Sequence, residues 1–232
     1  MKKTASILLA LAMIASAVGL GSCGSDSKGG QVSIQATTEP ELKDEFGVGF
    51  KVSDDGTLSV SSYTSDDKDV SIPDEFDGKP VKSVGQSAFK GQDITTVTMP
   101  DGLEKIGGFS FALCTKLEVA NIPEGVKSIG ANAFFADFAL TEIELPESLQ
   151  TIDINAFNAT GLKEIVIPKN VTSIGEFAFA DCTTLEQIQF SGKDTVVASN
   201  AFKGCDKLTI VAPKGSPVED VAKENKIDFI EL

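Results

Sequence analysis

The stretch SIGANAFFADFALTEIELP, residues 128–146, combines an Ala-Phe pair, regularly spaced aliphatic residues and a closing proline, and near-copies lie on both sides of it. Aligned on one phenylalanine, the copies are 22 or 23 residues apart. A fixed period in the twenties predicts a solenoid, in which each repeat forms one coil of a stack. The aligned residues are Phe89, Phe111, Phe134, Phe157, Phe179 and Phe202.

Aliphatic residues recur at fixed distances from this phenylalanine. A single repeat cannot bury its apolar edge alone, so we expect equivalent residues of neighbouring coils to stack on one another. Prolines at 73, 100, 123, 146, 168 and 213 close the strand-like segments, and Ser191 replaces one of the series. The aliphatic set before the phenylalanine is Val84, Ile106, Ile129, Ile152, Ile174 and Val197, and the set after it is Ile94, Leu117, Leu140, Leu162, Leu185 and Leu208.

The pattern within one repeat predicts its local structure. In LTEIELP, residues 140–146, Ile143 and Leu145 alternate with Glu142 and Glu144, as expected of a strand with one apolar side. Proline cannot donate to a ladder, so it should end the strand. The segment VKSIG predicts a second short strand, and ANAFFADF predicts one helical or 3₁₀ turn that places Phe134 in the core.

Both ends of the repeat array carry signals of a cap. FKVSDDGTLSVSSY, residues 50–63, alternates apolar and polar residues around Asp55-Gly56, which predicts a β-hairpin. At the other end, Ser216, Pro217 and Glu219 form a capping-box pattern that predicts a helix start. IDFIEL, at the C-terminus, predicts a last strand. A helix and a strand there would cover the open end of a solenoid.

The N-terminal residues predict a targeting segment rather than part of the fold. Lys2 and Lys3 precede an apolar run of 14 residues, which is short for a membrane span. Leu20-Gly21-Ser22-Cys23 then resembles a bacterial lipobox, in which Cys23 would be acylated, although an ordinary secretory signal is the alternative. The predicted organisation is a signal peptide (1–22), a flexible tether (23–45), a hairpin cap (46–72), the repeats (73–213) and a C-terminal cap (214–232).

The composition excludes several kinds of chemistry. The chain has no His, and all of its 20 basic residues are Lys. Without His there is no Ser-His or Cys-His nucleophilic pair and no imidazole metal ligand. Without Arg there is no bidentate fork for phosphate or carboxylate. With 34 Asp and Glu, a glycosidase-type carboxylate pair stays open as an enzymatic alternative.

The net charge of the chain excludes one class of partner but does not identify another. Without Lys2 and Lys3, 18 Lys face 34 acidic residues, a net charge of −16 for the mature chain. Such a surface repels nucleic acid, so we expect no nucleic-acid partner. We expect a monomer that is held at the membrane only through its lipid. The acidic clusters at Asp54-Asp55 and 65–69 lack the frame of a calcium loop, and no metal or cofactor is expected.

The repeats are specific enough to show a family resemblance. IPEGVKSIGANAFFADFALTEIELP (122–146) and IPKNVTSIGEFAFADCTTLEQIQF (167–190) resemble the BspA-like leucine-rich repeats of bacterial surface proteins. The likeness extends from about residue 50 to the C-terminus. It implies a leucine-rich-repeat solenoid displayed outside the cell, with binding or adhesion roles more often than catalysis. Ser191, Asp153 in place of a glycine, and a longer first repeat containing residues 77–80 depart from the pattern and should weaken single coils.

Three cysteines occupy one position of the repeat. Cys114, Cys182 and Cys205 each follow the aligned phenylalanine by three residues, where other repeats have Gln92, Asp137 and Thr160. A position shared with polar residues, without a CxxC spacing, argues against a zinc site or redox pair. We interpret it as a small, partly buried position. A disulfide between Cys182 and Cys205, which lie on adjacent coils, is the alternative.

The outward positions of the strands after each phenylalanine are the candidate binding face. If the strands lie in register, these positions form two rows across the solenoid, and solenoids build extended binding surfaces in this way. They contain no aromatic residue or Arg, the usual hot-spot types, so they indicate a face but no ligand. The first row is Thr96, Val119, Glu142, Glu164 and Gln187, and the second row is Thr98, Asn121, Glu144, Val166 and Gln189.

The sequence therefore predicts a non-catalytic bacterial lipoprotein of the cell envelope whose solenoid binds a protein partner or mediates adhesion. A structural spacer in the envelope is the first alternative. A carbohydrate-binding or glycosidase-type protein is a weaker one, because a flat, solvated strand row offers no burial that would make one carboxyl an acid and its neighbour a base.

Overall fold

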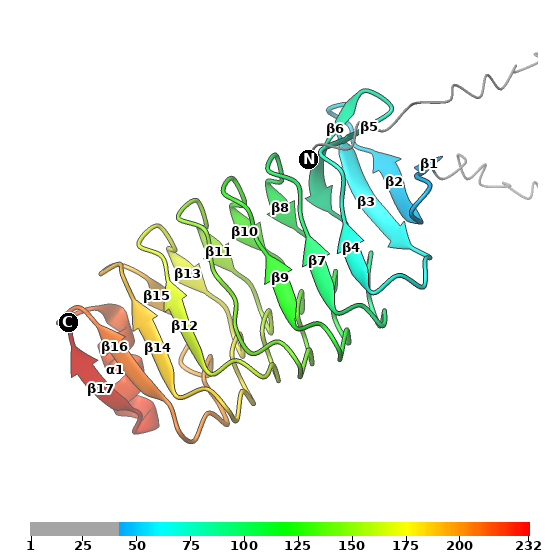
Figure 1. Cartoon of the computed structure of the whole chain (residues 1–232). Coiled ribbons are helices and arrows are strands. Elements are labelled where there is room, and N and C mark those ends of the chain that lie inside the picture. The colour runs from blue at the N-terminus through cyan, green and yellow to red at the C-terminus, as the bar shows by residue number, and fades with distance from the viewer. Residues whose placement is uncertain (1–41) are drawn as a thin grey trace, which may run out of the picture. The chain divides into compact units, whose positions relative to one another are not determined.

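The structure is a computed structural model that describes residues 42–232. These residues form about eight coils stacked along one axis, followed by one helix and a last strand (Figure 1). Each coil contains a leading strand, a central aromatic residue, which lies in a turn segment from Phe89 onward, and a trailing segment, which is a strand in every coil except that of Phe134. We name each coil by that residue, from Tyr63 to Phe202, and the turn segment covers, for example, residues 132–137 in the Phe134 coil. The predicted signal peptide, Cys23 and most of the predicted tether lie outside the described residues.

The leading strands form one long sheet. Parallel pairs join equivalent residues of successive coils, such as Ile106 with Ile129 and Ile129 with Ile152. An antiparallel hairpin precedes these strands, as expected for the N-terminal cap. In order, the sheet contains β1 (Leu42–Lys43), β2 (Val48–Val52), β3 (Leu58–Tyr63), β6 (Lys79–Val84), β8 (Lys105–Ile106), β10 (Ser128–Ile129), β11 (Thr151–Ile152), β13 (Ser173–Ile174) and β15 (Val196–Val197), with β5 (Glu75–Phe76) paired to β6.

The trailing strands form two sheets instead of one. The sheets comprise β4 (Asp69–Ser71), β7 (Thr96–Thr98) and β9 (Val119–Asn121) on one side, and β12 (Glu164–Ile167), β14 (Gln187–Phe190), β16 (Thr209–Ala212) and β17 (Asp228–Glu231) on the other. The strand predicted at residues 140–146 lies between them and has no strand pairing. Its inward residues Ile143 and Leu145 are only partly buried, whereas Ile165 and Ile188 of the following coils are buried.

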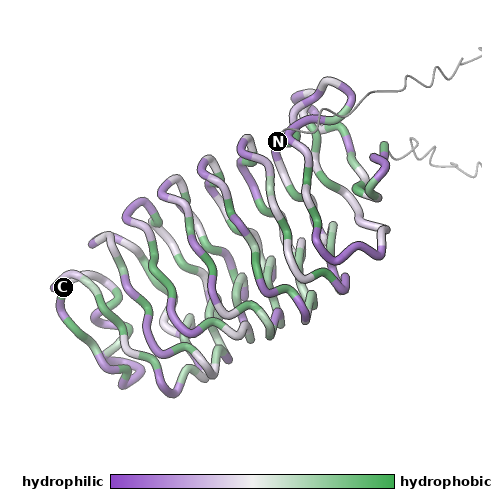
Figure 2. Tube along the Cα trace, in the orientation of Figure 1, coloured by the Kyte–Doolittle hydropathy of each residue, from purple (hydrophilic) through white to green (hydrophobic). Residues whose placement is uncertain are grey.

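An aromatic ladder runs through the core. The rings of the aligned phenylalanines are stacked, with centroids 5.1 to 6.0 Å apart, and Tyr63 begins the series 5.3 Å from Phe89. Figure 2 shows how apolar positions recur at the same places in successive coils. Aliphatic residues before and after each ring, such as Ile129 and Leu140, are fully buried. The repeat pattern therefore places its core as predicted.

The turn segments differ from the predicted short helix. In the Phe134 coil, Asn132 and Ala136, two residues before and two after the ring, have positive φ angles of 58° and 60°. Left-handed residues cannot continue a right-handed helix, so each segment is a chain of tight turns. Residues at these positions and the phenylalanine itself instead donate their N–H groups to the next coil, as Phe134 does to Ala156 O at 2.8 Å.

Two residues that depart from the repeat pattern still form the backbone hydrogen bonds between coils that are usual at their positions. Asp153, where other coils have glycine, donates its N–H to Ile129 O at 3.0 Å, as Gly130 does to Ile106 O. Ser191, where other coils have proline, gains an N–H that donates to Ile167 O at 2.9 Å. Neither substitution removes a backbone hydrogen bond from its coil.

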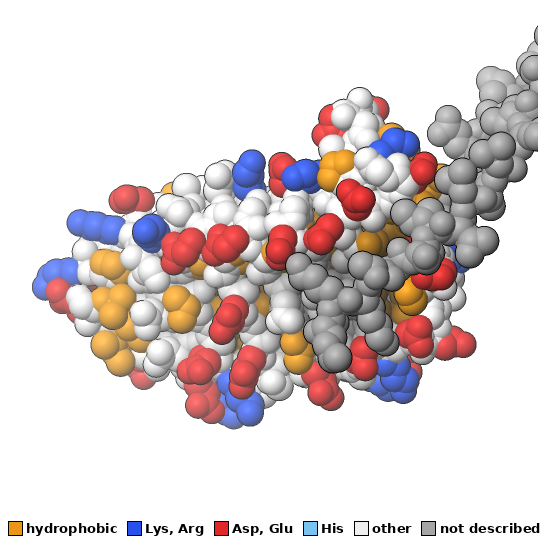
Figure 3. Space-filling view, turned by 45° about the horizontal axis from the view of Figure 1, so that its top comes forward, with side chains coloured by type: hydrophobic (Ala, Val, Ile, Leu, Met, Phe, Trp, Pro, Cys, Tyr) orange, Lys and Arg blue, Asp and Glu red, His pale blue; other side chains and the backbone are white. Residues whose placement is uncertain are grey.

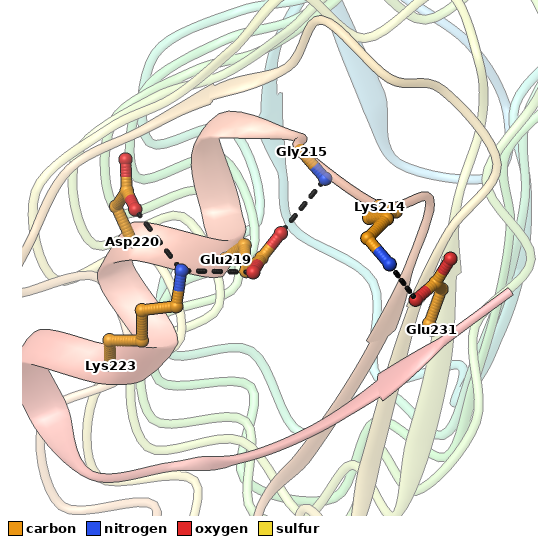
Figure 4. Close-up of polar contacts among 6 residues, drawn as sticks. All are labelled: Lys214, Gly215, Glu219, Asp220, Lys223 and Glu231. Carbon is orange, nitrogen blue, oxygen red and sulfur yellow. Dashed lines mark hydrogen bonds and ion pairs between the residues drawn. The ribbon is translucent and has the colours of Figure 1, made fainter.

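The C-terminal cap contains the predicted helix and strand. Helix α1 (Pro217–Asn225) buries Val218, Val221 and Ala222, and β17 follows it. The predicted capping box is not formed in its usual pairing. Ser216 makes no side-chain cap bond, whereas the Glu219 carboxylate accepts the Gly215 N–H at 2.8 Å (Figure 4). Lys223 pairs with Glu219 at 2.9 Å, and Lys214 with Glu231 at 3.1 Å.

Candidate binding face

The candidate binding face consists of the outward side chains of the trailing strands. Strand pairing aligns Thr96 with Val119 and Thr98 with Asn121 in the first sheet. In the second sheet it aligns Glu164 with Gln187 and Val166 with Gln189. The structure therefore brings these eight predicted residues into two rows within each sheet. All of them are exposed except Thr96 and Gln189, which are half-buried.

Glu142 and Glu144 lie between the two sheets rather than within either. Both side chains are exposed, but residues 142–145 make no backbone hydrogen bond to the coil on either side. The backbone hydrogen bond between coils that lies nearest to this segment runs from Lys163 N–H to Thr141 O at 3.2 Å. Glu142 falls between Val119 and Glu164 in the first row, and like charges at adjacent positions disfavour close pairing. The two acidic residues thus mark an interruption of the face.

In the structure, both rows extend further at each end than the rows predicted from the sequence. At the N-terminal end, Asp69 and Ser71 align with Thr96 and Thr98. Asp69 accepts hydrogen bonds from the hydroxyls of Thr95 and Thr96 at 3.0 and 2.8 Å. The alternation in the segment DVS, before Ile72 and Pro73, is the signal that would have found this strand.

At the C-terminal end, β16 and β17 extend the face. Thr209 aligns with Gln187 and Asp228, and Val211 aligns with Gln189 and Ile230. In the second sheet the second row contains two exposed apolar residues, Val166 and Ile230, each more than half exposed, whereas Gln189 and the buried Val211 lie between them. Figure 3 shows acidic side chains spread along the visible surface and hydrophobic ones at both ends of the stack. The second sheet therefore adds exposed apolar residues to a face that is otherwise mostly polar or acidic.

The cysteine position is a buried part of the core. Cys114, Cys182 and Cys205 are buried with free thiols, and Asp137 and Thr160 are buried at the same position. The expected partial burial is therefore wrong for these residues, and the alternative disulfide is absent. Each thiol donates to the carbonyl of the aromatic residue one coil earlier, as Cys205 does to Phe179 O at 3.0 Å. A sequence signal for this buried position was overlooked: most residues at this position carry a polar hydrogen.

Asp137 is the exception at this position. Both of its carboxyl oxygens are buried without a hydrogen-bond partner. Burial raises the pKa of the Asp137 carboxyl to about 9. Burial also raises the pKa of the Cys114 thiol to about 12, with a further contribution from the nearby Asp137 charge. These groups are therefore protonated at neutral pH and act as parts of the core, not as reactive groups.

Comparisons with known proteins identify the repeat. The model of the BspA type leucine rich repeat region matches residues 82–209 in six copies. The chain belongs to this family. A solved leucine-rich repeat protein from Bacteroides ovatus is 34% identical over 75% of the chain, with a TM-score of 0.66. Our chain covers only 47% of that protein, about half of its length.

Two further structures share the fold of this BspA-type solenoid. The leucine-rich repeat protein TpLRR of T. pallidum is 26% identical, with a TM-score of 0.67, and the match covers 80% of this chain and 94% of that one. The pneumococcal vaccine antigen PcpA is 23% identical, with a TM-score of 0.60, over 82% of this chain and 49% of that one. No curated protein matches the sequence.

The described residues contain neither a metal-ligand cluster nor a membrane-spanning helix. No group of three or more His, Cys, Asp or Glu residues within 42–232 is arranged to hold a metal ion. Across the same residues, no helix has the length and apolar character needed to cross a bilayer.

Proposed function

We propose that this BspA-type protein is a non-catalytic, lipid-anchored protein of the bacterial cell envelope that binds a protein partner through its trailing-strand face. The observation that carries the proposal is the contrast between the two sides of each trailing strand. Inward residues of the paired strands, such as Val97, Ile165 and Ile188, are apolar and buried. Outward residues are mostly exposed, aligned within each sheet and varied among the coils, which is the arrangement that lets a repeat protein recognise a partner.

The partner should be a protein rather than a nucleic acid. The face carries Glu142, Glu144 and Glu164 in its middle and no basic residue in either row. An acidic face repels phosphate backbones and favours a basic or mixed protein surface. The exposed apolar residues of the second row in the second sheet, Val166 and Ile230, add contact area that need not be charged.

The binding test is a panel of extracellular-matrix, host and bacterial surface proteins presented to the mature chain. The variant Glu142→Lys/Glu144→Lys reverses the charge at the centre of the face. A matched control, Glu147→Lys/Glu176→Lys, makes the same charge change at exposed positions outside the two rows. We expect the first variant to lose a captured partner and the control to retain it. Equal loss in both variants would show that only net charge matters and would contradict a defined binding face.

The lipid anchor is tested separately at Cys23. Growth with a palmitate analogue should label the wild-type chain, and the Cys23→Ser variant should lose the label and leave the membrane fraction. A mature chain that begins elsewhere, without label, would instead indicate an ordinary secretory signal.

A structural spacer is the second candidate, and the continuous aromatic ladder favours it because stacked rings make a stiff post. Deletion of residues 124–146, one whole coil, separates the two functions. Binding should fall sharply if the aligned rows matter, whereas a spacer should tolerate the slightly shorter stack. A glycosidase would need Glu142 and Glu164, both exposed, and loss of a measured hydrolysis in Glu142→Gln would support it.

A further inference from the structure

The turn segments of successive coils are hydrogen bonded in one direction only. In the Phe157 coil, Asn155, Phe157 and Ala159 donate their N–H groups to Glu176 O, Ala178 O and Ala180 O of the next coil at 2.8 to 3.0 Å. The residues between them bond within their own coil, as Asn158 N–H does to Asn155 O. Every turn segment therefore presents donors toward the C-terminal end of the stack and acceptors toward the N-terminal end.

The last turn segment has no coil after it to accept these donors. In the Phe202 coil, the equivalent N–H groups belong to Asn200, Phe202 and Gly204. None of the three donates a hydrogen bond to any described residue. After this coil the chain continues into β16, helix α1 and β17, and no further turn segment is built. A row of backbone donors is therefore left open at one end of the ladder.

Peptide dipoles aligned head to tail add up, and the end that exposes N–H groups is positive, as at the first turn of a helix. Successive backbone N–H groups that face one way also form anion-binding concavities outside helices. Five consecutive coils, from Phe89 to Phe179, each donate from the central aromatic N–H to the coil that follows. The donors of the Phe202 coil lie at the positive end of this ladder.

A groove of about 500 Å³ lies at this end, between residues 202–208 and residues 225–228. Phe202 and Gly204 line it, together with Lys203, Lys207 and Lys226. None of these three lysines forms an ion pair with a described residue, whereas Lys214 and Lys223 of the same cap are paired with carboxylates. Lys203 Nζ, however, lies over the Phe177 ring of the preceding coil, 5.9 Å from its centroid. Asp206 and Asp228 also line the groove, so lysines exceed acids by one.

We propose that this groove binds a small oxyanion, a carboxylate or phosphate group, on the Phe202 and Gly204 N–H groups, with charge supplied by Lys207 and Lys226. Charge-assisted hydrogen bonds from backbone N–H groups to an oxyanion are short and strong, and the lysines act as point charges around it. The site differs from the trailing-strand face and adjoins it only at Asp228, which lines the groove and ends the first row. In a chain with a net charge of −14, it is a place where unpaired lysines and open backbone donors coincide.

The test is a titration followed by amide NMR, using the chain without its predicted signal peptide, which retains all described residues. Inorganic phosphate and acetate are added separately, with sodium chloride at equal ionic strength as the reference. We expect the Phe202 and Gly204 amide protons to move downfield and saturate with at least one of the two anions. Shifts that grow linearly without saturation, or that affect all lysine-bearing segments equally, would overturn the proposal.

Two variants and two peptides complete the test. Lys207→Gln/Lys226→Gln should weaken binding about tenfold, whereas the control Lys169→Gln/Lys193→Gln, exposed lysines outside the groove, should not. Equal affinity in both variants would overturn the role of the groove. A short peptide with a free C-terminal carboxylate is compared with its C-terminal amide and with phosphoserine. Preference for the free acid identifies a peptide terminus as the ligand, and preference for phosphoserine identifies a phosphate ester.

Discussion

The ring of Phe134 lies parallel to that of Phe157, with centroids 5.3 Å apart and an angle of 1° between the planes. Both rings are fully buried. Phe134→Ala should therefore cost about 3–5 kcal/mol of the free energy of unfolding, because it removes a stacked ring and leaves a cavity. Urea denaturation followed by circular dichroism measures this change.

Phe202→Ala is the matched comparison at the end of the same ladder. Phe202 stacks on only one neighbour, at a longer centroid distance of 6.0 Å, and is slightly exposed. Its cost should be smaller than that of Phe134→Ala. An equal or larger cost at Phe202 would show that the ladder is not stabilised through its nearest neighbours.

Asp137→Asn should stabilise the protein at neutral pH. The folded pKa of Asp137, about 9, lies above the ordinary value near 3.8, so its contribution to stability is greatest below about pH 4 and is lost as the pH rises toward 9. The neutral amide removes this loss, and it can donate to a carbonyl as Gln92 does to Tyr63 O. A gain on the order of 1–4 kcal/mol at pH 7 is expected.

The control for this prediction is Asp194→Asn, an exposed carboxylate on the surface. Unfolding free energies of both variants are measured at pH 4, 7 and 9. The difference between Asp137→Asn and wild type should grow with pH and then level off, while Asp194→Asn should follow wild type. A difference that does not depend on pH would mean that Asp137 is already ionised in the folded protein.

Amide hydrogen exchange should reveal the interruption in the trailing strands. Residues 142–145 lack inter-coil backbone bonds, whereas Ile165 and Ile188 lie in paired strands. Exchange at 142–145 should be about 100-fold faster or more, because local opening there breaks no ladder. Glu142→Thr should slow it by removing the repulsion from Glu164, and Glu147→Thr, outside the row, should not. Equal protection of all trailing strands in the wild-type protein would contradict the interruption.

Ser216→Ala tests whether Ser216, which occupies the N-cap position but makes no cap hydrogen bond, stabilises helix α1. Loss of a serine N-cap usually costs about 1 kcal/mol. Here the Ser216 hydroxyl is buried without a partner, so its removal should cost nothing or stabilise slightly. Glu219→Gln should be the more harmful change, since the Lys223 pair and then the Gly215 N–H hold the Glu219 pKa below its usual value. Thermal denaturation of both variants measures the order of their effects.

The repeat pattern predicted most of the fold because each inward position recurs in the same chemical form. The period placed Phe89 through Phe202 in one ladder, and the aliphatic residues around them are buried as expected. The sequence did not reveal the left-handed residues around each ring. At these positions Ser, Phe, Asn, Leu, Ala and Asp all occur, so no residue type marks the conformation.

The candidate face was predicted in outline but not in extent. Alternation identified the central rows, and strand pairing aligned them within each sheet. The break at Glu142 was missed because LTEIELP has an ideal strand pattern, and pairing depends on the neighbouring coils as well as on the segment itself. The burial of Asp137 was missed for a similar reason, since a carboxylic acid is rarely placed in a core.

The one-way bonding of the turn segments makes the two ends of the stack chemically unequal, however many coils lie between them. Gene duplication or recombination that adds or removes a whole repeat would lengthen or shorten the solenoid and leave each end with the same unsatisfied backbone groups. The length of the candidate binding face and the chemistry of the two ends of the stack can therefore evolve separately in this protein.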